Sequence, residues 1–312
     1  MKSIMNRYIK RYYAILALAV VVMAAGCKED DDPSVARRDL APVTQALVNN
    51  SELVSTVFWD TTFVVAPGVE ETDIHYLSMK GLAMHLFILK ADLNHEGVEL
   101  SAMTPYGGTS FGTQPIPEMM KWVDEPGKKV VAGFNADFFD LNSGVPRGVV
   151  HLNGEIIKDI PMPGRCVMGI DADGIPMIVH SDDYPSMKEQ FVDALGASNI
   201  LLKDGAPAPI PSDAVFINPE PRTAVGFTAN NEIYFLVVDG RKFEYSNGMS
   251  LAELTEVFTA LGVENAANLD GGGSSTFVTR HSVADVFHVR NRPSDGSPRP
   301  VGNGWAILVN EN

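Results

Sequence analysis

Three pairs of apolar segments, each joined by a short turn, constrain the fold of this chain more than any other feature. In the first pair, residues 149–152 and 155–157 flank Asn153-Gly154. Asn-Gly accepts the positive φ angles of a type I′ turn, which connects two antiparallel strands. The sequence therefore predicts antiparallel hairpins across the middle of the chain. The other two pairs are residues 166–170 with 175–180 and residues 222–228 with 233–238.

Two segments carry the sequence signals of helix ends. In the first, Ser186 and Glu189 fit a capping box, and Gly196 is expected to end the helix. In the second, Ser250 begins a similar box before an apolar stripe at helical spacing, and Gly262 follows the stripe. Hairpins alternating with packed helices predict the α+β class, with a mixed, largely antiparallel sheet flanked by helices in a single catalytic domain.

The N-terminal segment resembles a targeting signal. Basic residues between Lys2 and Arg11 precede an apolar run over residues 14–25. That run is shorter than the roughly 20 residues of a membrane-spanning helix but suits a signal peptide. Small residues then lead to Cys27 in a pattern that resembles a bacterial lipoprotein box, which predicts lipidation of this cysteine.

These signals predict three parts of the chain. We expect a signal peptide at residues 1–26, an acidic, lipid-anchored tether at residues 27–40, and a catalytic domain at residues 41–312, which begins with a helix near residues 41–54. The acidic stretch of the tether resembles the export tag of some surface lipoproteins. The expected location is therefore the outer membrane, facing the cell surface, with membrane contact through the lipid anchor alone.

The composition excludes several classes of protein. Hydrophobic residues make up 45% of the chain and charged residues 20%, which excludes a disordered chain. Several long apolar runs, as in a multi-span membrane protein, do not occur. The formal net charge is -15. Because affinity for nucleic acid depends on Lys and Arg neutralising phosphates, no nucleic-acid partner is expected.

Several motifs of known chemistry are incomplete or missing. Asp171–Gly174 lacks the remaining ligands of a calcium loop and is interpreted as a turn. No His pair fits a zinc protease, and the chain has neither a nucleophile elbow nor a P-loop lysine. No metal site is predicted. His75, His85 and His95 are evenly spaced, but the spacing fits neither a helix face nor a strand face and is interpreted as coincidence.

A run of three glycines beside a predicted strand is the strongest site signal. Residues 268–276 are Asn-Leu-Asp-Gly-Gly-Gly-Ser-Ser-Thr. Consecutive glycines let the backbone approach a ligand closely and can direct N–H groups at an anion. Asp270 adds a carboxylate, and Ser274 adds a hydroxyl. A second polar segment, residues 135–144, follows the apolar run 130–134, but alone it fits a simple turn as well as a site.

Three arginines near predicted turns, Arg222, Arg241 and Arg299, could match phosphate or carboxylate oxygens bidentately. Together with the glycine loop they indicate a pocket for an anionic, hydroxylated ligand with carboxylates nearby. Hydrolysis of a glycosidic bond and hydrolysis of a phosphoester both fit such a pocket. The residues alone do not choose between these reactions.

These segments occur in the same order as in the phosphodiester glycosidase domain, which the chain resembles from about residue 133 to residue 309. The resemblance implies hydrolysis of a sugar-1-phosphodiester, such as an N-acetylglucosamine-1-phospho-sugar, at the anomeric C–O bond. It also implies a phosphorylated glycan as substrate and no cofactor. The matched residues are Asn135-Ala136-x-Phe138-Phe139-x-x-Asn142-Ser143-Gly144, Arg222-Thr223-Ala224-Val225-Gly226, Asp239-Gly240, Asn268-Leu269-Asp270-Gly271-Gly272-Gly273-Ser274 and Arg299-x-Val301.

The resemblance further implies roles for matched positions. Asp270 and Asp239 are candidates for the nucleophile or the water-activating base, and Asn135 is grouped with them as a catalytic position that contacts the sugar. We expect Arg222, Arg299 and the glycine loop to hold the phosphate, and Asn142 to contact sugar hydroxyls or an N-acetyl carbonyl. The candidate substrate-binding residues are Arg222, Arg299, Gly271, Gly272, Gly273, Ser274, Ser275, Asn142 and Gly144.

Two positions depart from the family pattern, and two other functions fit the residues. Asp137 and Asp140 stand where animal members have Ser and Arg, so the resemblance gives them no catalytic role. One alternative is a phosphodiesterase that breaks the P–O bond. The other is a surface glycan-binding lipoprotein without turnover. Such modules present exposed aromatic platforms, whereas Trp59, Trp122 and Trp305 are scattered, and Trp305 is expected in the core.

Overall fold

The three predicted hairpins all form. The computed structural model describes residues 39–281 and 283–311. Asn153 and Gly154 have φ angles of 52° and 81°, as the predicted type I′ turn requires. The hairpin strands are β6 (Val150–Leu152) with β7 (Glu155–Lys158), β8 (Cys166–Ile170) with β9 (Pro176–His180), and β13 (Arg222–Phe227) with β14 (Glu232–Val238).

The strands form three sheets with the orders β1-β2-β3-β14-β13-β15-β11-β12, β7-β6-β10-β8-β9 and β17-β16-β5-β18-β4. Every pair of named strands in the described residues is antiparallel. The predicted α+β class is therefore confirmed. The remaining strands are β1 (Val54–Ala66), β2 (Val69–Ser78), β3 (Ala83–Asp92), β4 (Glu99–Met103), β5 (Lys128–Asn135), β10 (Asp193–Ala197), β11 (Ile200–Lys203), β12 (Ala206–Pro207), β15 (Asn265–Asn268), β16 (Phe277–Arg280), β17 (Phe287–Val289) and β18 (Gly304–Asn310).

The helices are short, and α2 and α6 pack against the eight-stranded sheet. The helix after Ser250 is confirmed with its complete capping box, in which Ser250 and Glu253 each accept from the other's backbone N–H. The helix expected near residues 41–54 also forms, over nine residues. The helices are α2 (Pro42–Asn50), α3 (Ile116–Val123), α4 (Tyr184–Met187), α5 (Ala214–Ile217) and α6 (Leu251–Ala260), with 3-10 turns η1 (Pro105–Gly107), η2 (Lys188–Gln190) and η3 (Gly272–Ser274).

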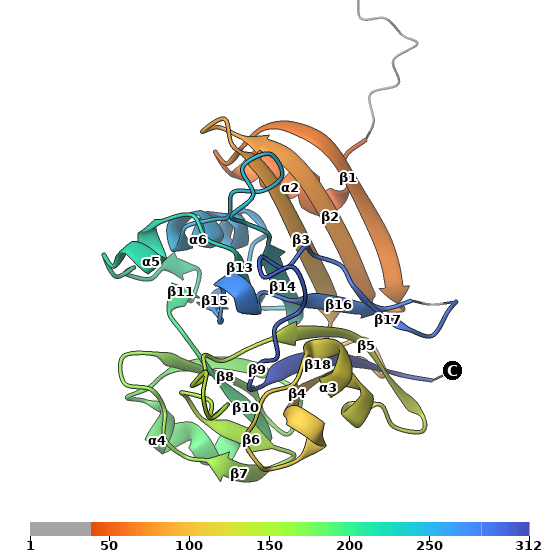
Figure 1. Cartoon of the computed structure of the whole chain (residues 1–312), viewed down its shortest axis with the longest axis vertical. Coiled ribbons are helices and arrows are strands. Elements are labelled where there is room, and N and C mark those ends of the chain that lie inside the picture. The colour runs from red at the N-terminus through yellow and green to blue at the C-terminus, as the bar shows by residue number, and fades with distance from the viewer. Residues whose placement is uncertain (1–38, 282, 312) are drawn as a thin grey trace, which may run out of the picture. The chain divides into compact units, whose positions relative to one another are not determined.

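The largest core cluster lies where the three sheets meet. The ring of Phe134 in β5 stacks on that of Phe235 in β14, with ring centroids 4.3 Å apart, and on that of Phe277 in β16, with centroids 4.8 Å apart. Figure 1 shows β5, β16 and β18 between the long strands β1–β3 and the sheet that contains β6 and β10. A second cluster joins the eight-stranded sheet to α2 and α6. Leu40–Asn312 thus forms one compact unit.

The predicted helix over residues 186–196 is wrong. One turn of helix and a 3-10 turn end at Gln190, and Asp193–Ala197 is the fully buried strand β10 between β6 and β8. Gly196 does not cap a helix. A Cβ on Gly196 would lie 2.5 Å from Asp137 Oδ2 and 2.7 Å from Gly148 Cα, so this glycine permits close approach of the buried Asp137 carboxylate and of the segment before β6. Burial in the sheet outweighed the local capping signal.

Cys27 and the predicted signal peptide lie outside the described residues, as does most of the predicted tether. Within residues 39–281 and 283–311, no helix is long and apolar enough to cross a membrane.

Candidate active site

Four strand ends meet at one place in the structure. Ala224 of β13 lies opposite Asn268 of β15, and Phe134 of β5 lies opposite Phe277 of β16. The Leu269 N–H donates to the Thr223 carbonyl at 2.9 Å, which joins the loop after β15 to β13. As a result, the two polar segments predicted at residues 135–144 and 268–276 come together.

Asn135 connects these strand ends and is buried, with 1% exposure. Its Nδ2 donates to the Asp270 carbonyl at 2.6 Å. Its Oδ1 accepts from Thr223 Oγ1 at 2.8 Å and from the Thr276 N–H at 3.0 Å. The Asn135 side chain is therefore occupied by the protein itself, which makes it a residue that positions Asp270 rather than one that reaches a sugar.

A cavity of about 290 Å³ opens beside Asp270 and the glycine loop. The lining combines arginines and carboxylates with apolar side chains of the loop after β5 and of α5. Its lining residues are Phe138, Arg165, Val215, Phe216, Glu220, Arg222, Arg241, Asp270, Gly271, Gly272, Gly273 and Arg299.

Each glycine of the loop is in close contact with another residue. A Cβ on Gly271 would lie 2.6 Å from the Pro221 carbonyl oxygen, and one on Gly273 would lie 2.0 Å from Arg299 Nη2. Gly272 has a φ angle of 61°, which favours glycine. The loop backbone therefore closely approaches the protein's own carbonyl and guanidinium groups, and it also lines the cavity.

Asp270 carries the carboxylate of this loop in the cavity. Burial raises its pKa to about 6, while the Ser274 hydroxyl, the positive charge of Arg299 and the Gly271 N–H each lower it. The backbone of Asp270 is held on both sides, because its N–H donates to the Ala136 carbonyl at 2.7 Å and its carbonyl accepts from Asn135. A fixed carboxylate with a pKa near neutrality suits a base or a nucleophile.

The two arginines predicted to hold phosphate differ in burial and in the groups to which their guanidinium N–H groups donate. Arg222 is buried, and its Nε and Nη2 donate to the carbonyls of Met249, Val215 and Asn218 at 2.7, 2.7 and 2.9 Å. Desolvation lowers its pKa to about 10. Arg299 is partly exposed, pairs with Asp295 at 2.7 Å, and directs Nη1 to Ser274 Oγ at 3.4 Å. Arg222 thus mainly supports the cavity wall, whereas Arg299 faces the loop and the cavity.

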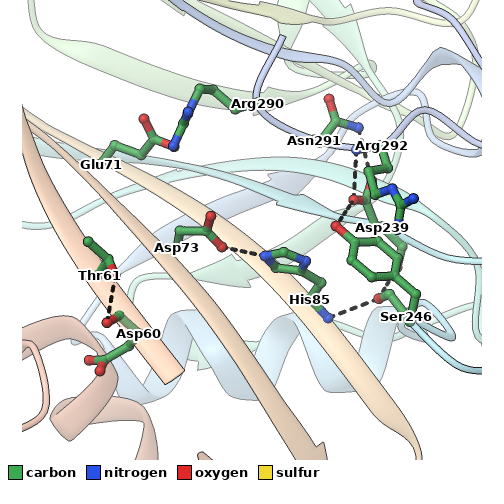
Figure 2. Close-up of polar contacts among 11 residues, drawn as sticks. Asp60, Thr61, Glu71, Asp73, His85, Asp239, Ser246, Arg290, Asn291 and Arg292 are labelled. Carbon is green, nitrogen blue, oxygen red and sulfur yellow. Dashed lines mark hydrogen bonds and ion pairs between the residues drawn. The ribbon is translucent and has the colours of Figure 1, made fainter. Parts of the chain in front are cut away.

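Asp239 lies outside the cavity lining, in the polar cluster of Figure 2. Its Oδ1 accepts from Asn291 Nδ2 at 3.0 Å, and its Oδ2 accepts from the Arg292 N–H at 2.8 Å and from Tyr245 Oη at 3.0 Å. Burial raises its pKa, against these hydrogen bonds. Asn291 Nδ2 also donates to the Ser275 carbonyl at 3.0 Å. Asp239 therefore supports the far end of the loop through Asn291, and it lies outside the lining of this cavity.

Four predicted binding residues do not line the cavity. Ser274 is buried, and its Oγ accepts from Arg299 Nη1 at 3.4 Å. Asn142 is exposed, and its N–H donates to Asp140 Oδ1 at 3.2 Å within its own loop. Gly144, with a φ angle of 72°, packs its backbone against Gly112. Ser275 is buried, and its hydroxyl has no hydrogen-bond partner in the described part of the chain.

His75 and His85 are direct neighbours across β2 and β3, with ring centroids 5.2 Å apart. The interpretation of their spacing as coincidence is therefore wrong, because a hairpin with this register brings residues ten apart together. His85 pairs with Asp73 (Figure 2), while His95 is apart from them and exposed. Among the described residues, no group of three His, Cys, Asp or Glu side chains could hold a metal ion.

Sequence analysis missed several lining residues. Arg165 lies over the Phe216 ring at 5.1 Å, and its Nη1 donates to Ser198 Oγ and Asn199 Oδ1. Glu220 pairs with Arg241, one of the three arginines that the sequence indicated as able to match phosphate or carboxylate oxygens. No sequence motif marks Arg165, Phe216 or Glu220.

With this geometry established, comparison with known proteins identifies the family. The family model described as phosphodiester glycosidase matches residues 128–308, more than half of the chain. This chain belongs to the phosphodiester glycosidase family. The matched range contains the glycine loop, the four meeting strand ends and every residue that lines the cavity.

A curated relative agrees with the family. The chain is 28% identical over 166 residues to the N-acetylglucosamine-1-phosphodiester alpha-N-acetylglucosaminidase of Bos taurus. The match covers 48% of this chain and 31% of the bovine protein. The chain thus spans about a third of the length of this relative.

Two solved structures share the fold of this family member. A hypothetical protein from Synechocystis superposes with a TM-score of 0.66 at 14% identity, over 80% of this chain and 64% of that one. The zebrafish N-acetylglucosamine-1-phosphodiester alpha-N-acetylglucosaminidase catalytic domain, described as auto-inhibited by its pro-peptide, gives a TM-score of 0.61 at 20% identity, over 81% and 88%. At these identities the likeness concerns the fold.

Proposed function

We propose that this chain hydrolyses a sugar-1-phosphodiester, such as an N-acetylglucosamine-1-phospho-sugar, at the anomeric C–O bond. The observation that carries the proposal is the Asp270 carboxylate in a cavity lined by the glycine loop and Arg299. Family membership supports the phosphodiester class of substrate. The products are the free sugar and a phosphomonoester.

The leaving group explains why one well-placed carboxylate can suffice. A phosphate ester is a weak base, so it departs with the electron pair of the C–O bond without a strong general acid. Asp270 acts either as a nucleophile at C1 or as the base that takes a proton from the attacking water. Arg299 and the loop backbone hold the phosphate, whose charge changes most as the bond breaks.

The decisive experiment follows oxygen from solvent. The purified protein is incubated with an N-acetylglucosamine-1-phospho-sugar in oxygen-18 water, and the products are read by mass spectrometry. Label in the free N-acetylglucosamine is expected, because water then attacks carbon. Label in the phosphate would replace the proposal with a phosphodiesterase, and binding without turnover across a panel of sugars would replace it with a binding module.

We also propose that Cys27 is lipidated and holds the protein at the outer membrane, facing the cell surface. The basic stretch, short apolar run and small residues before Cys27 support this proposal. Cells given a labelled fatty acid should label the wild type and not Cys27→Ser. Protease added to intact cells should remove a surface-facing protein, and resistance there with digestion after lysis would contradict the surface location.

A further inference from the structure

Arg241 combines a strained backbone with a position on the cavity wall. Its φ angle is 62°, in the left-handed region that arginine seldom adopts. The other non-glycine residues with positive φ are mostly Asn or Asp, which tolerate it. Among the residues that line the cavity, Arg241 is the one side-chain-bearing residue in this conformation.

The chain on both sides of Arg241 maintains this conformation. A Cβ on Gly240 would lie 2.8 Å from the Pro221 nitrogen and 3.1 Å from Gly248 Cα, so Gly240 is tightly packed. Lys242 exchanges two backbone hydrogen bonds with Ser246, at 3.0 and 2.8 Å. Strain that the surroundings enforce is commonly found where a side chain must be presented to a ligand.

The Arg241 guanidinium is oriented by two contacts. Nε donates to Glu220 Oε2 at 2.8 Å. Nη2 and Nη1 lie 3.3 and 3.7 Å from the point where a Gly272 Cβ would be. Neither Nη atom donates a hydrogen bond to any of the described residues, so these two nitrogens are available to a ligand. Any side chain at Gly272 would press against it.

We propose that Arg241 binds the phosphate oxygens of the substrate end-on through Nη1 and Nη2, with Glu220 as the residue that positions it. This inference rests on the proposed function and changes the assignment within it. Arg222, predicted for this role, has Nε and Nη2 occupied by carbonyls, whereas Arg241 has its Nη pair free beside the glycine loop. An end-on guanidinium matches two oxygens of one phosphate.

The test compares Arg241→Gly, Arg241→Lys and the control Asp204→Gly. Asp204 also has positive φ, at 51°, but it is exposed in the β11–β12 turn and absent from the cavity lining. Both glycine variants relieve strain, so their Tm should equal or exceed that of the wild type. Arg241→Gly should lose about 10- to 100-fold in kcat/KM, as expected for a hydrogen bond to a charged group, while Asp204→Gly retains wild-type activity.

Arg241→Lys separates geometry from charge. It keeps the positive charge without the planar fork, so its kcat/KM should lie between those of the wild type and Arg241→Gly. A lower Tm together with lower activity in Arg241→Gly would indicate a structural role and overturn the proposal. Wild-type activity in Arg241→Gly would overturn it as well.

Binding of inorganic phosphate, measured by calorimetry, distinguishes this inference from the proposed reaction. The wild type could bind phosphate without turning over the phosphodiester, while Arg241→Gly binds phosphate more weakly. That result would contradict the proposed reaction but support phosphate binding by Arg241. Equal phosphate affinity in the two proteins would remove the arginine's role whatever the turnover. A wild type that neither turns over nor binds phosphate would overturn both.

Discussion

A side chain at Gly273 would place its Cβ 2.0 Å from Arg299 Nη2 and 2.5 Å from Asp295 Oδ1. The guanidinium and its ion-pair partner therefore lie directly on the backbone of Gly273. Asp295 fixes Arg299 there, accepting from Nε at 2.8 Å and lying 2.7 Å from Nη2. The third glycine of the loop thus makes room for an arginine.

Gly273→Ala should displace Arg299 from the loop. We expect kcat/KM on the phosphodiester to fall about 10- to 100-fold, because a charged hydrogen bond to the substrate is lost. The matched control is Gly112→Ala, since a Cβ on Gly112 would meet nothing within 4 Å. Steady-state measurement of kcat/KM for both variants tests the prediction. Unchanged kcat/KM in Gly273→Ala would show that Arg299 does not bind the substrate.

Asp270→Asn should abolish turnover while leaving the fold intact, because an amide neither attacks carbon nor takes a proton. In the wild type, kcat/KM should fall as the pH drops through about 6, where the Asp270 carboxyl becomes protonated. A pH–rate profile checks the position of this acid limb. Full activity of the variant would remove Asp270 from the mechanism.

Asp270 should also affect the pH dependence of stability. Because its pKa is raised on folding, the folded state binds this proton more tightly than the unfolded chain does. The resulting stabilisation is present below the ordinary pKa and is lost as the pH rises through about 6. Asp270→Asn should therefore gain stability relative to the wild type between about pH 4 and pH 7. Denaturant unfolding of both proteins at the two pH values measures their free energies of unfolding. A difference between variant and wild type that is the same at both pH values would contradict the prediction.

Asp239→Asn should reduce stability more than catalysis. The substitution replaces one carboxylate oxygen of Asp239 with an NH₂ group. This donor then faces another donor, either the Arg292 N–H or Asn291 Nδ2. We expect Tm to fall by about 2–10 °C, from an unsatisfied buried group. The kcat/KM of the folded protein should stay within about tenfold of the wild type. Wild-type Tm with no turnover would instead restore Asp239 as a catalytic residue.

Cys166 should be unreactive in the folded protein. It is buried in β8, and burial raises the pKa of its thiol to about 12. In a Cys27→Ser background, where Cys166 is the remaining cysteine, a thiol reagent near pH 8 should react only after denaturant is added. Rapid labelling of the native protein would show that this strand opens locally.

Local sequence determined the hairpins, α6 and the location of the glycine loop. Asn153-Gly154 defines its turn because both residues accept positive φ, and Ser250 with Glu253 caps a helix through bonds within one turn. These signals act over a few residues, so they do not depend on the rest of the chain. The order of the polar segments was also sufficient to recognise the family.

Tertiary structure alone decided which polar residues reach the cavity. Asn135 and Asp270 are far apart in sequence, yet one hydrogen bond joins them, because β5 pairs with β16, the strand that follows the loop of Asp270. Asp239 and Arg241 are close in sequence, but Asp239 turns to Asn291 while Arg241 lines the cavity. Strand register, packing and the competition for hydrogen-bond donors depend on contacts between distant segments, which local sequence signals do not contain.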